Sequence, residues 1–358
     1  MQPSMTADHL GKLQRENCAA ASRAQPAVKQ ENWRQRLRRR VIGRGIEMMC
    51  GPSLALSTNV AADIPLLRAA ARLAYLKALG AVGVKSFVAR SGLGHDFVCH
   101  VGDLAGFPFY HPDAYRAELE LAAGWLHQDE QAIAFDVGAN GGFFSTQLAQ
   151  MRALVKIYAF EPVPTTFGKL AQSVQRLGLS GRVEPVAAAV LDAPGAVQMS
   201  WSDKDSLHAQ VTPHGLNARA GDQLTSAAGI TLDAFCASAG VCPSLVKIDV
   251  EGSEAAVLRG AARLLARSDR PVILFEFNPV TLAECDADAD TLAALLAGYT
   301  LHYVDDLRGR MLPFGAPVGD LRKIDWICNL FAVPRVEAAT RRWAFVSREL
   351  QDRIAPVA

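Results

Sequence analysis

The stretch AFDVGANGGFFS, residues 134–145, decides the fold. An apolar run leads into a glycine-rich turn, and a helix-compatible segment follows it. Glycine lets the backbone turn sharply and approach a ligand without a Cβ clash. The spacing Gly138-x-x-Gly141, with Asp136 before it, differs from the dinucleotide pattern G-x-G-x-x-G and is closer to a nucleoside-binding loop. The stretch therefore predicts a strand, a ligand-binding turn and a helix, the alternative being an ordinary strand–helix turn.

Six more apolar runs follow along the chain and read as β-strands. They are VKIYAFE (155–161), RVEPVAA (182–188), SLVKIDV (244–250), PVILFEF (271–277), LHYVDD (301–306) and DWICNLFAV (325–333). Helix-compatible segments lie between most of them. Strands that alternate with helices indicate βαβ units. The sequence therefore predicts an α/β protein with a doubly wound, mostly parallel sheet.

The second predicted strand ends in a carboxylate, in the motif AFEPVP (159–164). Glu161 follows Asp136 by 25 residues. An acidic side chain at this place can accept hydrogen bonds from both hydroxyls of a ribose. The motif favours a nucleoside site over the alternative, a surface carboxylate at a strand end.

The motif LVKIDVEGSE (245–254) adds three charged residues to the fourth predicted strand. Lys247, Asp249 and Glu251 are spaced by two, so in an extended chain they share one face. Charges in a buried strand are costly unless they are paired, and Lys247 can neutralise Asp249 or Glu251. Ligands of α/β sheets bind at the carboxyl ends of the strands. The motif predicts functional carboxylates there, the alternative being a purely structural salt bridge.

Four motifs in this order resemble the FkbM family of S-adenosylmethionine-dependent methyltransferases. They are AFDVGANGG (134–142), YAFEPVPTTFGKL (158–170), TLDAF (231–235) and VKIDVEGSEAAVLRGA (246–261), and the resemblance covers about residues 130–335. It implies a class I, Rossmann-like methyltransferase fold with seven strands, the last antiparallel, and helices on both faces. It also implies methyl transfer from S-adenosyl-L-methionine to a hydroxyl oxygen on a sugar, polysaccharide or secondary metabolite.

The resemblance also implies which residues hold the cofactor. Asp136, Gly138, Asn140 and Gly141 would line its methionine and ribose part, Glu161 would hold the ribose hydroxyls, and Pro162 would shape the adenine edge. A second glycine follows Gly141 where relatives often carry a larger residue.

Methyl transfer to an alcohol calls for a base near the acceptor oxygen, because a protonated alcohol is a poor nucleophile. A carboxylate within hydrogen-bond reach can take the proton. We expect Asp249 to do so, with Glu251 as the second candidate and Lys247 as the group that orients them. His208, in the stretch DSLHAQV, is an alternative base.

Magnesium assistance is a variant of this mechanism. Asp249 lies at the end of one predicted strand, and Glu276 and Asn278 lie at the end of the next; together they offer the hard oxygen ligands that Mg²⁺ prefers. The arrangement resembles the site of catechol O-methyltransferases, which place adjacent Asp-Asn on the later strand. Here the residues are Glu-Phe-Asn. We therefore expect no metal in the site.

Composition bounds the partners and the compartment. The 358 residues include 37 Lys and Arg against 36 Asp and Glu, for a net charge of +1, so no global field attracts nucleic acid. A local segment, residues 33–44, carries six arginines and is a candidate for docking to a membrane surface or a protein. The seven cysteines form no C-x-x-C pair, and the sequence has no apparent membrane span or secretory signal. These features favour the cytoplasm.

The pattern along the chain predicts four parts. Residues 1–32 are expected to be mobile, and residues 33–130 to form a mainly helical extension. Residues 131–335 would form the methyltransferase domain with an insertion at 192–230, and residues 336–358 a C-terminal helix. A non-catalytic scaffold that binds the cofactor or a glycan is the alternative function.

Overall fold

The computed structural model describes residues 65–354, except 112–113, 128, 130, 203–204, 212–221, 306–309, 314–320, 323 and 325–326. The predicted mobile segment 1–32 and the arginine-rich segment 33–44 lie outside the described residues.

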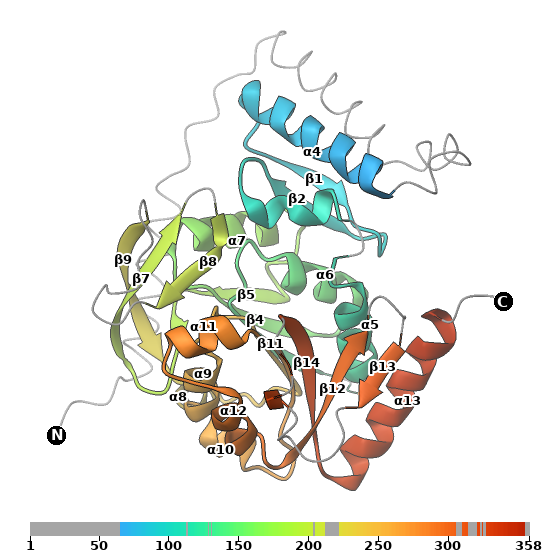
Figure 1. Cartoon of the computed structure of the whole chain (residues 1–358), viewed down its shortest axis with the longest axis vertical. Helices are drawn as coiled ribbons and strands as arrows, with labels where there is room; N and C mark the ends of the chain where they lie inside the picture. The colour runs from blue at the N-terminus through green and yellow to red at the C-terminus, as the bar shows by residue number, and fades with distance from the viewer. Residues whose placement is uncertain are drawn as a thin grey trace.

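The centre of the molecule is an eight-stranded sheet (Figure 1). Its strand order is β13-β12-β14-β11-β10-β3-β4-β5. The strands are β3 (Ile133–Val137), β4 (Lys156–Phe160), β5 (Val183–Val186), β10 (Leu245–Ile248), β11 (Val272–Phe277), β12 (Tyr299–Asp305), β13 (Arg310–Pro313) and β14 (Cys328–Pro334). Neighbours from β5 to β11 pair in parallel, whereas β14 runs antiparallel to both β11 and β12. The seven predicted strands and the antiparallel last strand are thus confirmed, and β13 adds an eighth strand at the edge.

Helices cover both faces of this sheet because its strands are apolar on both sides. One face, with Ala134, Leu245 and Phe331, packs against α5 (Arg116–Leu126), α6 (Phe143–Met151), α7 (Pro164–Arg176) and α13 (Glu337–Ile354). The other, with Phe135, Val246 and Phe275, packs against α8 (Leu232–Ala239), α9 (Glu254–Arg259), α10 (Ala262–Leu265), α11 (Pro279–Glu284) and α12 (Ala289–Leu295). Side chains that alternate between faces therefore enter two separate cores, as in a doubly wound fold.

The described residues before the main sheet form a small unit with its own core. It consists of α4 (Pro65–Ala81), the hairpin of β1 (Ser86–Arg90) and β2 (Asp96–His100), and the 3₁₀ helix η1 (Leu104–Phe109). Leu76, Phe87, Phe97 and Phe109 are buried in this core. The unit contacts the main domain through Phe97, whose ring meets that of Phe143 edge to face at 5.2 Å between centroids.

A second sheet interrupts the alternation between the third and fourth parallel strands. Its four strands are β6 (Ala189–Val190), β7 (Gly195–Ser202), β8 (Asp205–Val211) and β9 (Gln223–Ile230), in the order β6-β9-β7-β8. β7 and β8 form a hairpin within the predicted insertion at 192–230, and β9 and β6 widen it into a sheet. Figure 1 shows this sheet beside the carboxyl ends of the central strands.

Side-chain contacts connect the last helix, α13, with the carboxyl-terminal end of α5. The guanidinium of Arg342 donates to both carboxylate oxygens of Asp129 at 3.0 Å and lies 4.2 Å from the ring centroid of Trp125. The indole nitrogen of Trp125 donates in turn to the carbonyl of Ser244, just before β10, at 3.0 Å. These contacts fix α5 relative to both the sheet and the end of the chain.

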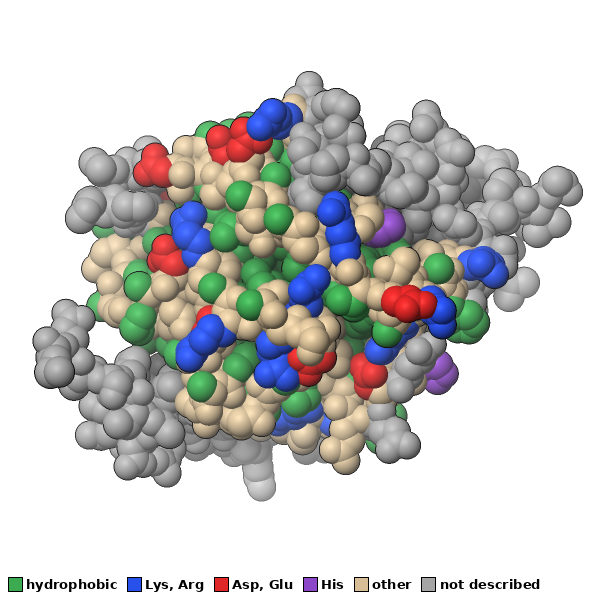
Figure 2. All heavy atoms as spheres, turned by 90° about the horizontal axis from the view of Figure 1, so that it is seen from below, with side chains coloured by type: hydrophobic (Ala, Val, Ile, Leu, Met, Phe, Trp, Pro, Cys, Tyr) green, Lys and Arg blue, Asp and Glu red, His purple; other side chains and the backbone are tan. Residues whose placement is uncertain are grey.

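The surface carries no large region of one charge on the face seen in Figure 2, where basic and acidic side chains of the described residues are interspersed. None of the helices in the described part of the chain has the length and apolarity needed to cross a bilayer.

Candidate active site

A cavity lies at the carboxyl ends of β3, β4 and β10. The cavity has a volume of about 530 Å³, which includes space open to solvent. Gly138, Asn140 and Glu161 line one side, and Asp249, Glu251 and Ser253 line another. The apolar end includes Phe160, Ala188 and Val190 from the main domain and Met199, Ala209 and Val211 from the second sheet. The site is thus polar where the strands end and apolar toward the insertion.

Gly138 makes the first turn of the cavity wall. Its φ is +80°, and its backbone passes so close to β10 that a β-carbon would lie 1.8 Å from the carbonyl oxygen of Asp249. The amides of Gly138 and Ala139 donate to the carbonyl of Phe160 at 3.1 and 2.9 Å, which ties the turn to the end of β4. Only glycine fits here, because any side chain would meet fixed backbone.

Asn140 continues the turn with a φ of +50°. Its side-chain oxygen accepts from the amide of Gly141 at 2.6 Å. Asparagine tolerates the left-handed region because its short polar side chain makes such local hydrogen bonds. Gly141 itself points away from the cavity: a β-carbon there would lie 3.5 Å from Cδ2 of His100, which belongs to β2.

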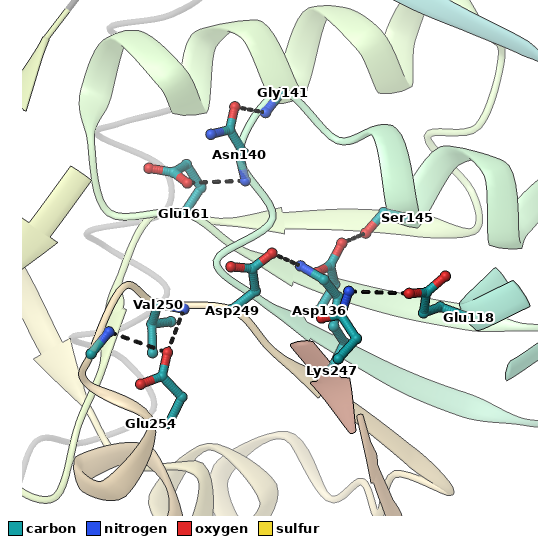
Figure 3. A network of polar contacts seen from close by, with 12 residues as sticks. Glu118, Asp136, Asn140, Gly141, Ser145, Glu161, Lys247, Asp249, Val250 and Glu254 are labelled. Carbon is teal, nitrogen blue, oxygen red and sulfur yellow. Dashed lines mark hydrogen bonds and ion pairs between the residues drawn. The ribbon is translucent and has the colours of Figure 1, made fainter. Parts of the chain in front are cut away.

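Glu161 is buried beside this turn, with an exposed fraction of 4 %. One of its carboxylate oxygens accepts from the amide of Asn140 at 3.1 Å (Figure 3). The other accepts from the amide of Val163 at 2.9 Å. Burial raises the pKa of Glu161 to about 7, although these hydrogen bonds oppose the shift. A carboxylate offers about four acceptor positions, so two remain for hydroxyl donors of a ligand.

Lys247 is buried beneath the cavity and holds two aspartates together (Figure 3). Its Nζ lies 3.1 Å from Oδ2 of Asp249 and 3.3 Å from Oδ1 of Asp136. The other oxygen of Asp136 accepts from the hydroxyl of Ser145 at 2.6 Å. Burial disfavours the charged amine, but the two carboxylates outweigh that effect and raise the pKa of Lys247 above its usual range. Lys247 therefore remains charged and fixes Asp249 at the cavity wall.

The segment after β10 turns sharply at Glu251 and Gly252, with φ values of +52° and +103°. A β-carbon on Gly252 would lie 2.3 Å from the carbonyl of Thr281. Oε1 of Glu254 accepts from the amides of Val250, at 3.2 Å, and Gly252, at 3.3 Å. Burial raises the pKa of Glu254 to about 7. Glu251 therefore reaches the cavity through this turn, and not as part of the extended chain that the spacing of Lys247, Asp249 and Glu251 suggests.

Three carboxylates meet where this turn faces β11. Ligand oxygens of Asp249, Glu251 and Glu276 lie within 4.8 Å of one another. Burial, reinforced by the charge of Asp249, raises the pKa of Glu276 to about 8. Asn278 is not part of this group, because its side-chain oxygen caps α11 by accepting from the amides of Val280 and Thr281 at 3.1 and 3.4 Å.

The lining has the chemistry of a site for a cation with a diol and a flat apolar group. Neither lysine nor arginine is among the described residues that line the cavity, whereas Glu161, Asp249 and Glu251 do line it. An adenosine moiety with a sulfonium matches these features: Glu161 can accept from ribose hydroxyls, the acidic wall suits the positive charge, and the apolar end suits the base.

The predicted site residues occupy two layers. Gly138, Asn140, Glu161, Pro162, Asp249 and Glu251 line the cavity. Asp136 and Lys247 lie behind Asp249, and Gly141 faces His100. His208 lies in β8, and its side chain lies outside the described residues.

Sequence reasoning missed the contribution of the second sheet to the cavity. Met199, Ala209 and Val211 alternate with residues of the opposite face on β7 and β8, and they form the apolar wall. This alternation is the signal that could have found them, but only the sheet's docking places that face over the cavity.

Comparison with known proteins finds a family match over the residues of this site. Residues 136–303 match the family described as the methyltransferase FkbM domain, which confirms the resemblance seen in the motifs. The hexuronic acid methyltransferase AglP of Haloferax volcanii is 27 % identical over 172 residues, which are 47 % of this chain and 62 % of that protein. The match thus spans less than two thirds of that relative.

Solved methyltransferase structures match this chain only distantly. A SAM-dependent methyltransferase from Agrobacterium tumefaciens has a TM-score of 0.37 and 10 % identity, covering 69 % of each chain. TYW2 of M. jannaschii, in complex with AdoMet, has a TM-score of 0.35 and 13 % identity, covering 69 % of this chain and 85 % of that one. At such scores the fold assignment rests on the strand order and the family match of this chain itself.

Proposed function

Starting from the FkbM methyltransferase domain at residues 136–303, we propose that the protein transfers a methyl group from S-adenosylmethionine to a hydroxyl oxygen of a sugar, polysaccharide or secondary metabolite. The observation that carries the proposal is that Glu161 and Asp249 line the same cavity. In this proposal one carboxylate holds a ribose, and the other takes a proton. The hexuronic acid methyltransferase relative supports a sugar as the acceptor class.

In this proposal the residues of the turn after β3 hold the cofactor. Gly138 and Asn140 form the wall along its methionine and ribose part, Glu161 accepts from the ribose hydroxyls, and Pro162 borders the base. S-adenosylmethionine supplies an electrophilic methyl group when it is bound. The acidic lining favours its positive charge, because opposite charges attract more strongly in a partly enclosed site than in water.

Asp249 acts as the base, with Glu251 as the second candidate. The acceptor oxygen forms a bond to the methyl carbon as the carbon–sulfur bond breaks, and the hydroxyl proton passes to the Asp249 carboxylate. Lys247 holds that carboxylate at 3.1 Å, so Asp249 approaches the acceptor in one orientation. Positioning of this kind contributes several kcal/mol, up to about 7–11 in well-oriented cases.

The experiment combines calorimetry with transfer of label from S-adenosylmethionine to the glycan fraction of a cell extract. Asp249→Asn and Glu251→Gln should each bind the cofactor, and Asp249→Asn should lower the transfer rate by about 10²–10⁴, the usual contribution of a general base. Asp192→Asn is the matched control, because Asp192 is half exposed and pairs with Arg259 at the surface. Cofactor binding without transfer by the wild type would favour a non-catalytic scaffold. Full transfer by both variants would remove these carboxylates from the mechanism.

A further inference from the structure

Tyr115 precedes α5 and has an unusual backbone conformation. Its φ is +56°, in the left-handed region that a bulky side chain rarely adopts. Among the described residues, four that are not glycine have a positive φ, and two of the others, Asn140 and Glu251, line the cavity. Backbone strain of this kind tends to gather at functional sites. The conformation of Tyr115 is therefore a reason to ask where its side chain lies.

The direction of α5 places Tyr115 at the carboxyl edge of the sheet. α5 packs on the sheet and leads, after a short connection, into the amino end of β3, so its own amino end lies near the carboxyl end of that strand. Two aromatic rings hold the Tyr115 ring there, with centroid distances of 5.8 Å to Phe107 and 6.3 Å to Phe143. Phe143 begins α6 directly after the glycine turn that borders the cavity.

The next turn of α5 shows which way this face of the helix points. Glu118, three residues after Tyr115, is buried and accepts from Nδ2 of Asn329 at 3.1 Å. Asn329 is the register partner of Glu276 on the neighbouring strand. Figure 3 shows Glu118 reaching toward the group formed by Asp136, Lys247 and Asp249. Tyr115 is the N-cap of α5, one turn before Glu118, so it lies at the end of the helix that is nearer the carboxyl edge of the sheet.

The surroundings of the hydroxyl agree with this placement. Burial raises the pKa of Tyr115, and Asp249 is the largest charge that adds to the shift, with smaller effects of Lys247, Glu276 and Glu118. The hydroxyl remains protonated at every working pH, so it can donate a hydrogen bond but cannot serve as a base. No described residue forms a hydrogen bond with it.

We propose that Tyr115 is a substrate-binding residue of the methyl-transfer site, whose hydroxyl donates a hydrogen bond to an oxygen of the acceptor and orients the reacting hydroxyl toward Asp249. This inference rests on the proposed function and extends it, because Tyr115 lies before the matched domain at residues 136–303. The segment that precedes the methyltransferase domain thereby contributes to acceptor recognition.

Tyr115→Phe tests the inference, because it removes only a hydroxyl that forms no hydrogen bond with any described residue. The probe is labelled S-adenosylmethionine with the glycan fraction of a cell extract. We expect kcat/KM for the acceptor to fall at least about tenfold, mainly through KM, with the Kd of the cofactor and the Tm unchanged. The shape of the pH profile should also stay the same. Tyr299→Phe is the control, since Tyr299 is buried at the amino end of β12, at the opposite edge of the sheet.

The outcomes separate this inference from the proposed function. If the wild type transfers label and Tyr115→Phe matches it in KM and kcat, Tyr115 has no part in acceptor binding, although the proposed function stands. An equal loss in cofactor affinity or a lower Tm would assign Tyr115 a structural role and overturn the inference. If the wild type binds no cofactor and transfers no label, the proposed function fails and the inference fails with it.

Discussion

The backbone carbonyl oxygen of Asp249 lies 1.8 Å from the place where a β-carbon on Gly138 would be. The glycine turn after β3 and Asp249, the residue proposed as the base, are therefore in direct backbone contact. No side-chain rearrangement can relieve a clash between these two positions, so the geometry of the turn and of Asp249 depend on each other.

A comparison of Gly138→Ala with Gly94→Ala should distinguish the effect of this contact from the effect of backbone strain alone. Gly94 has nearly the same φ, +82° against +80°, but no atom lies within 4 Å of the position that a β-carbon would take there. We expect Gly94→Ala to lower the free energy of unfolding by about 1 kcal/mol. Gly138→Ala should cost a further ~1–3 kcal/mol from overpacking, and should abolish cofactor binding measured by calorimetry. Native cofactor affinity in Gly138→Ala would contradict the contact described here.

Lys247→Met should destabilise the protein strongly. The change leaves Asp136, which is 1 % exposed, buried without its cation. Removing one partner of a buried ion pair costs about 3–5 kcal/mol. Lys156→Met provides the comparison, because Lys156 pairs with Glu184 at the surface and such pairs contribute about 0–1 kcal/mol. Denaturant unfolding of both variants measures the difference, and equal losses would show that the Lys247 pair contributes no more than a surface pair.

Cofactor affinity should increase with pH through the pKa of Glu161. Ribose hydroxyls donate to the ionised carboxylate, whereas burial raises the pKa of Glu161 to about 7 and keeps much of it protonated below that pH. Between about pH 6 and pH 8 the ionised fraction rises about tenfold, so the Kd should fall about tenfold. Calorimetry in buffers with different ionisation enthalpies should detect the proton released on binding. Glu161→Gln should bind weakly with no such slope, and a slope that survives in this variant would assign the titration to another group.

The raised pKa of Glu161 has the opposite effect on the stability of the protein without ligand: stability decreases as the pH rises. The folded state holds a proton on Glu161 that the unfolded state has already lost between about pH 4.5 and pH 7. The contribution of Glu161 to stability is therefore present below this window and is lost as pH rises through it. Glu254, with a pKa of about 7, acts in the same direction.

Chelation should leave methyl transfer unchanged. Asp249 is already paired with Lys247, whose Nζ lies 3.1 Å from its Oδ2. Asn278, the third ligand of the predicted magnesium variant, is engaged in capping α11. The comparison is the rate of label transfer before and after treatment with EDTA, and a loss that Mg²⁺ restores would return the metal to the mechanism.

The sequence predicts the central sheet well because its signals are local. A strand that is buried on both faces is a continuous apolar run, and each of the seven such runs became a strand of the sheet. The second sheet gives a weaker signal. β7 and β9 carry polar residues such as Gln198 and Ser226 on their outer positions, and they are held by pairing with each other across an intervening segment.

The sequence predicts most of the residues that form the site, but not how these residues pair with one another. The pairing of Lys247 with a neighbouring carboxylate follows from the cost of a buried charge, and Asp249 is one of the two partners observed. The other, Asp136, is distant in sequence and meets Lys247 because β3 and β10 are neighbours in register. Glu251 does not continue the extended strand, because its φ is positive. The neighbouring Gly252 packs closely against Thr281 of α11, a contact between distant parts of the sequence.

The clamp between Arg342 and Asp129 gives the end of the chain an influence on the opposite end of α5. This helix has 11 residues and so spans about 16 Å, with the clamped connection at one end and Tyr115 at the other. A helix is stiff over such a length, so the contacts of Arg342 with Asp129 and Trp125 also support the position of Tyr115 at the carboxyl edge of the sheet. In this way α13 braces a residue beside the site although α13 itself lines no part of the described cavity.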